Sequence, residues 1–283
     1  MNKFNRNYRL TMQGRGKQVI EIAMPFNLEF DVIRSIAISP NSSTIRISNL
    51  NESTRNLIRK DTWELGDFRF INLKAGYSER GISTIFSGNI NIARSYREGV
   101  NYITDIECFD GGFGLINGQT DISFTKGTTR SSMMKQAMKD MPGVSVGKIG
   151  KGFDIKLSRG NSKTGKSVSI IEDLAGGAFF VDNGVGNVLG DNECLKGSLD
   201  VIDSSMGILS TPRYENTHVT IEMLLEPRII VGQKLTIDSS FNKAFNLEYK
   251  VISVHHKGTV SETKAGTATT TLTLLSSKAL VIA

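Results

Sequence analysis

The chain has 283 residues and a mass of 31.0 kDa, a length that suits one large domain or two to three small ones. It is 39% hydrophobic and 22% charged with only 5 Pro, which excludes a disordered chain and a Pro-rich linker. Charged residues interrupt every apolar run, and the basic residues 1–17 lack the apolar stretch of a signal peptide. The net charge of +6 is dispersed along the chain and gives no indication of nucleic-acid binding.

The first third has the pattern of short strands separated by glycine turns. Residues 44–48 alternate between polar and apolar side chains, which is typical of a half-buried strand. We expect further strands within 18–31, 68–71, 82–86, 90–92 and 102–109, with turns at Gly76, Gly81, Gly88 and Gly99. One short helix interrupts them, with Ser53 as its N-cap. This spacing indicates a barrel or a sandwich.

The middle third, after Asp110-Gly111-Gly112, has helical periodicity. Residues 128–141 predict an amphipathic helix that stops at Pro142-Gly143 and whose apolar face is formed by Met134, Ala137, Met138 and Met141. We interpret these methionines as core rather than as an adaptable binding surface. A second helix is expected over 167–175, with a capping box of Ser169 and Glu172 and an end at Gly176. A strand over 178–182 and an Asn183-Gly184 turn follow.

The last third returns to strands, at 219–225, 235–237, 249–254 and the threonine-rich 267–275. The order is therefore β, then α/β, then β. The sequence predicts a mainly β protein with a smaller α/β insert.

Residues 160–167 match the phosphate-loop pattern GxxxxGK[ST], with Gly160, Gly165, Lys166 and Ser167 at its defining positions. In such a loop, backbone N–H groups hold phosphates, the Lys meets the β- and γ-phosphates, and the hydroxyl binds Mg²⁺. Residues 153–157 suit a preceding strand, and Asp182 suits a carboxylate that orients the Mg²⁺. A nucleotide-binding enzyme is therefore the alternative function.

The surrounding sequence favours a plainer interpretation of this motif. A phosphate-loop fold needs an alternating β-α series that builds a parallel sheet, and only about 80 residues here are not strand-and-turn meander. Asp182 also follows Ser167 so closely that the strand carrying it would have to be the very next strand after the motif. We expect residues 160–167 to be a flexible loop that runs into a helix N-terminus, with no bound cofactor.

No other set of residues predicts catalysis or metal binding. His218, His255 and His256 lie on strand-like segments without a metal-ligand spacing, and no GxSxG elbow is present. Asp105, Glu107 and Asp110 are close in sequence, but Asp105 and Glu107 share one strand face, which is typical of a solvated surface. Cys108 and Cys194 could pair, but the absence of a signal peptide favours isolated, half-buried thiols. A carbohydrate-binding module needs clustered aromatics, and Trp63 is the single Trp.

Several segments carry a family resemblance. Residues 209–237 (LSTPRYENTHVTIEMLLEPRIIVGQKLTI) and 249–259 (YKVISVHHKGT) resemble the C-terminal tube-like domain of tailed-bacteriophage baseplate hub proteins, the adaptors between tail tube and central spike. Residues 86–111 (FSGNINIARSYREGVNYITDIECFDG) are similar to the end of that family's N-terminal domain, and residues 169–184 (SIIEDLAGGAFFVDNG) to its middle element. Together they cover most of the chain in the expected order.

The resemblance implies a structural protein and not an enzyme. Two tail-tube-like β-barrel domains, 1–112 and 194–283, would flank a middle α/β domain, 113–193. Three chains would form a pseudo-sixfold ring that joins the hexameric tail tube to the trimeric spike. Since barrels in a ring are stabilised by pairing strands across subunits, the threonine-rich strand 267–273 is the candidate edge.

The resemblance also implies the partners and the location. These are further copies of the chain, the tail tube protein, a separate central spike protein (since no spike, lysozyme or peptidase region follows) and the surrounding wedge proteins. DNA would be only passing cargo in the lumen, and no membrane span is expected. The protein would be made in the host bacterial cytoplasm and reside in the virion baseplate.

Overall fold

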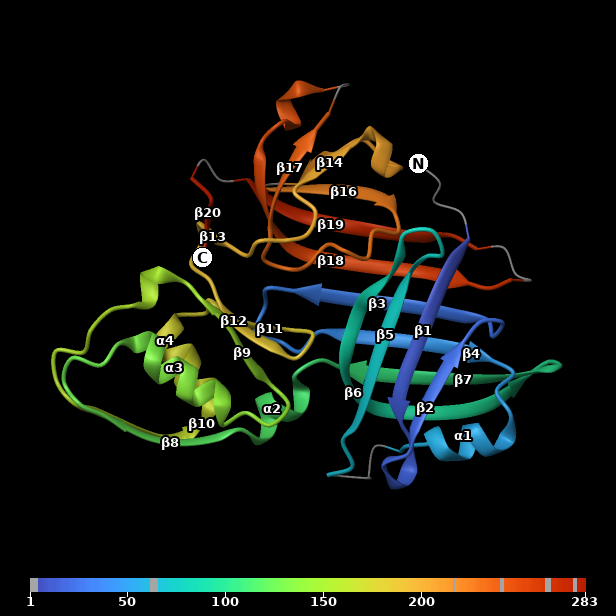
Figure 1. Ribbon diagram of the computed structural model, residues 1–283, viewed down its shortest axis with the longest axis horizontal. Helices are drawn as coiled ribbons and strands as arrows, with labels where there is room; N and C mark the ends of the chain where they lie inside the picture. Colours follow the sequence, from blue (N-terminus) through green and yellow to red (C-terminus); the bar gives the residue numbers. More distant parts are fainter. Residues whose placement is uncertain (1–4, 62–65, 216, 240–241, 263–265, 277–278) are drawn as a thin grey trace.

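Strands make up most of the molecule (Figure 1). The computed structural model describes residues 5–61, 66–215, 217–239, 242–262, 266–276 and 279–283. The α-helices are α1 (Glu52–Ile58), α2 (Gly112–Asn117), α3 (Arg130–Lys139) and α4 (Ser167–Ala175). Short 3-10 helices lie at Arg15–Lys17, Lys151–Phe153, Ser204–Met206 and Lys243–Phe245. The strands are β1 (Arg6–Gln13), β2 (Val19–Ala23), β3 (Leu28–Ser35), β4 (Ser42–Ser48), β5 (Arg69–Tyr77), β6 (Gly81–Glu98), β7 (Asn101–Phe109), β8 (Gln119–Phe124), β9 (Ser145–Ile149), β10 (Asn161–Lys166), β11 (Phe179–Asp182), β12 (Val185–Val188), β13 (Glu193–Cys194), β14 (Val201–Asp203), β15 (Arg213–Glu215), β16 (His218–Leu224), β17 (Lys234–Asp238), β18 (Glu248–Val260), β19 (Ala268–Ser276) and β20 (Val281–Ile282).

One large sheet contains thirteen of the described strands. Its main path runs β15-β16-β19-β18-β3-β4-β7-β6-β5-β1-β2, with β17 paired to β18 and β14 to β17. The central pairing joins β3 to β18 antiparallel, from Ser35 opposite Ser253 to Leu28 opposite Val260. Strands from the two ends of the chain therefore form a single sheet through this seam, as Figure 1 shows.

Three hydrophobic clusters fill the interior. The first is built mainly on β1 to β7, and Leu225, Val260 and Ala268 from the C-terminal third join it. The second lies among β14 to β19 and also receives Phe180 from β11. The third belongs to what we call the α/β unit, the helices α3 and α4 with strands β8 to β12, which lies beside the large sheet in Figure 1.

All four residues of β11 are buried, and they face different parts of the molecule. Phe179 and Val181 belong to the cluster of the α/β unit, whereas Phe180 packs in the C-terminal cluster. The Phe180 ring lies beside Gly232, where a Cβ would come within 3.0 Å of it. This short strand therefore ties the α/β unit to the large sheet.

Several sequence predictions are confirmed. The molecule is mainly β, and the helix expected at 128–141 is α3, capped by Thr129, whose side chain accepts a hydrogen bond from the Ser132 N–H. The predicted methionine face is core, since Met134, Met138 and Met141 are buried. As expected, α4 ends at a left-handed Gly176.

Other local predictions are wrong. Asn51, not Ser53, caps α1 by accepting from the Thr54 N–H. The predicted box of Ser169 and Glu172 does not cap α4, because β10 runs directly into that helix and its N-cap position, Lys166, makes no side-chain cap bond. Residues 6–13, noted above only as basic, form β1 in the large sheet.

Gly88 does not make the predicted turn, because residues 81–98 form the single strand β6. A Cβ on Gly88 would lie 2.5 Å from the Phe109 carbonyl oxygen, so this glycine allows β6 and β7 to approach closely. Gly76 likewise lies inside β5, whereas Gly81 and Gly99 have positive φ and begin or precede strands as turn residues.

The threonine-rich strand is not an edge, which corrects the expectation for 267–273. These residues belong largely to β19, which pairs with β16 on one side and β18 on the other. Alternating Thr and Leu simply place one hydroxyl face and one core face on an interior strand. Among the described residues, the main path ends instead at β2 and β15.

We predict that Phe180→Ala lowers the free energy of unfolding by about 3–5 kcal/mol, because it leaves a cavity where β11 meets the C-terminal cluster. Phe70→Ala is the matched control, since Phe70 is 42% exposed, and should cost no more than about 1 kcal/mol. Urea denaturation of both variants measures the difference. Equal losses would show that β11 does not join these parts.

Candidate functional site

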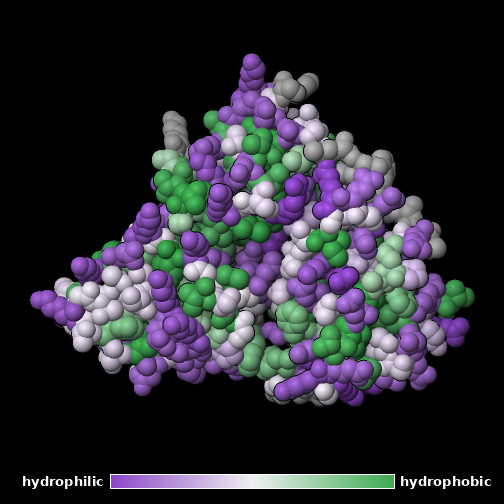
Figure 2. Space-filling model, in the orientation of Figure 1, coloured by the Kyte–Doolittle hydropathy of each residue, from purple (hydrophilic) through white to green (hydrophobic). Residues whose placement is uncertain are grey.

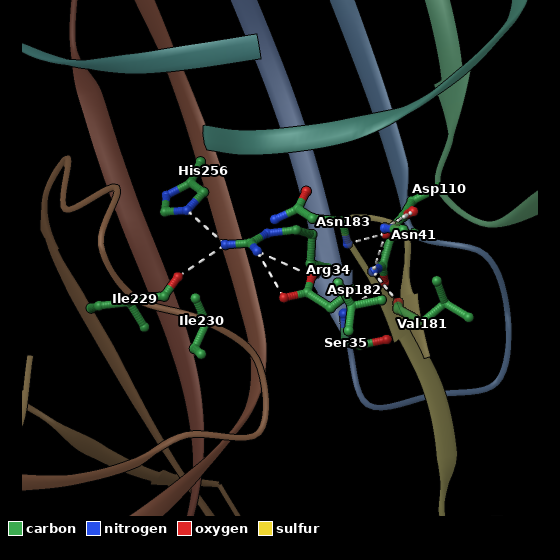
Figure 3. Close-up of polar contacts among 12 residues, drawn as sticks. Arg34, Ser35, Asn41, Asp110, Val181, Asp182, Asn183, Ile229, Ile230 and His256 are labelled. Atoms are coloured by element: carbon green, nitrogen blue, oxygen red, sulfur yellow. Dashed lines mark hydrogen bonds and ion pairs between the residues drawn. The ribbon is translucent and has the colours of Figure 1, made fainter. Parts of the chain in front are cut away.

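The most elaborate polar arrangement lies where β3, β11 and the segment before β17 meet (Figure 3). Arg34, on the inner face of β3, is fully buried, and its Nη1 donates to both carboxylate oxygens of Asp182 at 3.0 and 3.1 Å. Its Nη2 donates to the Ile229 carbonyl oxygen at 3.0 Å. One guanidinium therefore binds the N-terminal third, the α/β unit and the C-terminal third together.

We call the polar arrangement of Arg34, Asn41, Asp110, Asp182 and His256 the junction. His256, on β18, forms its C-terminal side. Its Nε2 lies 3.4 Å from Arg34 Nη2, and its Nδ1 lies 2.9 Å from Thr270 Oγ1, which also accepts from the Glu226 N–H. Because a guanidinium can only donate, the network assigns the proton of a neutral ring to Nδ1. Burial, together with the charge of Arg34, holds the pKa of His256 well below its usual value, so the ring is neutral.

Asp110 and Asn41 form the other side of the junction. Asp110 follows β7 and accepts from the Gly184 N–H at 2.8 Å, from the Asn183 N–H, and from Asn41 Nδ2 at 3.4 Å. Asn41 Nδ2 also donates to the Val181 carbonyl oxygen at 2.8 Å. Burial, and next the charge of Asp182, raise the pKa of Asp110 to about 7 against the opposing effect of these N–H donors.

The junction holds charged groups but offers none of them to a ligand. Arg34, Asp110 and His256 are all fully buried. Nucleophilic or acid–base catalysis needs a group within reach of a bound substrate. What this geometry can do is fasten three parts of the chain in one relative position.

The phosphate-loop motif does not have the predicted loop conformation. Residues 161–166 form β10, which pairs antiparallel with β8 from Asn161 opposite Phe124 to Lys166 opposite Gln119. An extended strand directs successive N–H groups to opposite sides, whereas a phosphate loop needs them to converge. The strand expected at 153–157 is absent from the described structure, which has a 3-10 helix at Lys151–Phe153.

The side chains of the motif also do not converge on a common site. Ser167 Oγ is buried and 2.7 Å from Thr120 Oγ1, while Lys166 is exposed. Gly160 immediately precedes β10, and Gly165 lies within it, opposite Thr120 in register. Asp182, the expected Mg²⁺-orienting carboxylate, pairs with Arg34.

We predict that the protein does not bind ATP with Mg²⁺, because the motif lacks converging N–H groups. Isothermal titration calorimetry of the wild type and of Lys166→Ala should give the same featureless trace. A saturable heat that Lys166→Ala abolishes, and that the neighbouring Lys163→Ala keeps, would overturn this expectation.

The other residues singled out in the sequence are dispersed. His255 Nε2 lies 2.7 Å from Asp31 Oδ1; burial alone would raise the pKa of Asp31, but the hydrogen bonds from His255 and Lys257 outweigh it and lower the pKa. His218 lies on β16 within 3.4 Å of the Thr217 hydroxyl. Within the described ranges, no three His, Cys, Asp or Glu side chains are grouped as metal ligands, and no helix is long and apolar enough to cross a membrane.

Both thiols are free, as predicted, but they are buried and not half-buried. Burial raises the pKa of Cys108 far above its usual value and that of Cys194 to about 11, so neither is a reactive thiolate. Asp105 pairs with Arg46 at 3.0 Å on the sheet surface, and Glu107 is exposed. Trp63, the basis of the carbohydrate argument, lies outside the described residues.

The junction was not predicted from the sequence, although one signal was present. Arg34 continues the inward-facing series Leu28, Phe30 and Val32 on β3, a position where a charge must find a buried partner. Nothing local identifies that partner, because Asp182 is far away in sequence.

We predict that Arg34→Met costs about 3–5 kcal/mol of stability, because it leaves Asp182 buried without its cation. Arg34→Met combined with Asp182→Leu should cost clearly less than the sum of the single changes, since no charge is then stranded. Arg46→Met, which breaks a surface pair, should cost no more than about 1 kcal/mol. Denaturant unfolding of the four variants tests this, and additive losses would contradict it.

Comparison with known proteins agrees with the fold. Residues 8–261 match the model of the family described as Baseplate hub gp41. No protein with a curated description matches this chain.

Three solved structures illustrate the likeness. The 43 kDa tail protein of prophage MuSo2 from Shewanella oneidensis has a TM-score of 0.62 at 6% identity, covering 96% of this chain and 99% of its own. The tail protein of Neisseria meningitidis MC58 has a TM-score of 0.61 at 11% identity, and the match covers 96% of this chain and 97% of that protein. The E. coli c3393 protein has a TM-score of 0.56 at 8% identity, and the match covers 95% of this chain and 78% of that protein. It is described as a component of the type VI secretion system that is structurally similar to the T4 tail proteins gp27 and gp5. At such identities these structures show a shared fold, and the family match over most of the sequence shows that the chain belongs to the baseplate hub gp41 family, structural proteins of the phage tail.

Proposed function

We propose that the protein forms a homotrimeric ring that adapts the hexameric tail tube to the trimeric central spike, without catalytic activity. The observation that supports this best is the β3–β18 seam, which joins N-terminal and C-terminal strands of one chain in one sheet. A chain that supplies two tube-like units allows three copies to match a sixfold tube.

The two units would be barrels at 1–112 and 194–283, flanking an α/β domain at 113–193. Separate hydrophobic clusters support this division. Phe180 and Leu225 each pack in a cluster of another part, so the three domains would move as one body.

The surface supports assembly with other proteins. Strands β2 and β15 end the main path of the described sheet and could pair across subunits. Several large apolar side chains are more than half exposed, among them Val19, Val100, Leu209, Tyr214 and Val281. In Figure 2, an apolar patch at the upper left lies where Figure 1 places β13 and β20. Such surfaces would contact the tube, spike and wedge proteins, with DNA only passing through the lumen of the ring in the virion.

We predict a particle of about three times 31.0 kDa for the purified chain, measured by light scattering after size exclusion over a range of concentrations. Addition of ATP should leave the mass unchanged, which distinguishes the ring from the nucleotide-binding alternative. A dimer or a tetramer would contradict the ring. A stable monomer would restrict the proposal to a ring that forms only on the spike or tube, to be sought in isolated tails.

A further inference from the structure

The junction contains one carboxylate more than its cation can neutralise. Arg34 is paired with Asp182, and His256 is neutral. Asp110 faces Asp182 and accepts hydrogen bonds from the neutral donors Asn41, Asn183 and Gly184. We propose that the junction is a proton-sensitive fastening, in which the charge on Asp110 sets how firmly the α/β unit is held to the large sheet.

Asp110 is placed to act on the α/β unit because it stands where the chain leaves the sheet. Its own N–H donates to the Asn41 carbonyl oxygen at 2.9 Å, which anchors it to the β3–β4 loop. Gly111 follows in the left-handed region, with φ of 66°, and turns the chain into α2. The carboxylate of Asp110 then holds the Asn183-Gly184 turn between β11 and β12.

The polar network around Asp110 is incompletely satisfied. Arg34 Nε and Asn183 Oδ1 are both buried without a hydrogen-bond partner in the described structure. In Figure 3 the Asn183 side chain lies beside the guanidinium. Buried polar atoms without a partner raise the free energy of the closed junction. This lowers the additional free energy that a local opening requires, so a change in the charge of Asp110 can shift the balance between closed and open.

The direction of the effect follows from linkage. The pKa of Asp110 is about 7 when the junction is closed and 3.8 for an ordinary, solvated carboxyl, so closing the junction favours the protonated form. Opening therefore becomes easier as the pH rises from about 4 through 7. The charge of His256 does not offset this effect, because burial and the charge of Arg34 hold the pKa of His256 well below its usual value.

The test is hydrogen exchange of the full-length protein between pH 5 and 8, corrected for intrinsic rates. The readout is the Asn183 and Gly184 amides, which donate to Asp110. In the wild type we expect the opening equilibrium of this turn to increase about 10- to 100-fold over this range. In Asp110→Asn, which carries no titratable group, the increase should disappear.

Asp105→Asn is the matched control, because Asp105 lies on the same strand but pairs with Arg46 at the surface. It should keep the pH dependence of the wild type. If Asp110→Asn does not fold, ¹³C carboxyl titration of the wild type decides: a midpoint near neutral pH supports the proposal. Three results would each overturn it. The first is a titration midpoint of the Asp110 carboxyl near 4, and the second is an opening equilibrium of the wild-type turn that does not change with pH. The third is a folded Asp110→Asn variant whose opening keeps the pH dependence of the wild type.

Discussion

The buried ion pair of Arg34 and Asp182 is the constraint on which the arrangement of this molecule depends. A guanidinium that is fully shielded from water is tolerated only with its partner and its hydrogen bonds in place. That requirement holds β3, β11 and the Ile229 carbonyl within contact distance. Separating β3 from β11 would strand a buried charge, and moving the Ile229 carbonyl away would remove one hydrogen bond of the guanidinium.

Hydrophobic packing reinforces what the ion pair specifies. The side chains of β11 alternate between the cluster of the α/β unit and, through Phe180, the C-terminal cluster. The seam between β3 and β18 passes directly over the junction, with Arg34 opposite Val254 in register. One continuous sheet and a short, fully buried strand therefore connect the two ends of the chain with the α/β unit.

The extent of prediction from sequence differed between elements for physical reasons. The helix α3 was predictable because its buried methionines recur at helical spacing and Pro142-Gly143 ends it. Gly88 was misjudged as a turn because a glycine needed for close strand contact has the same letter as one needed for positive φ. The phosphate-loop pattern at 160–167 matched letter by letter, yet pairing with β8 extends residues 161–166 into a strand.

By itself, the sequence determined the mainly β composition and the α/β segment in the middle, because these depend on local periodicity and spacing. It also contained enough ordered family resemblance to indicate a baseplate hub, which the match over 8–261 confirms. Only the tertiary structure decided that β19 is interior, that Asp110 turns inward and that Arg34 meets Asp182. Those facts depend on contacts between residues far apart in the chain, and no local pattern records which distant partner a buried charge or a strand edge will find.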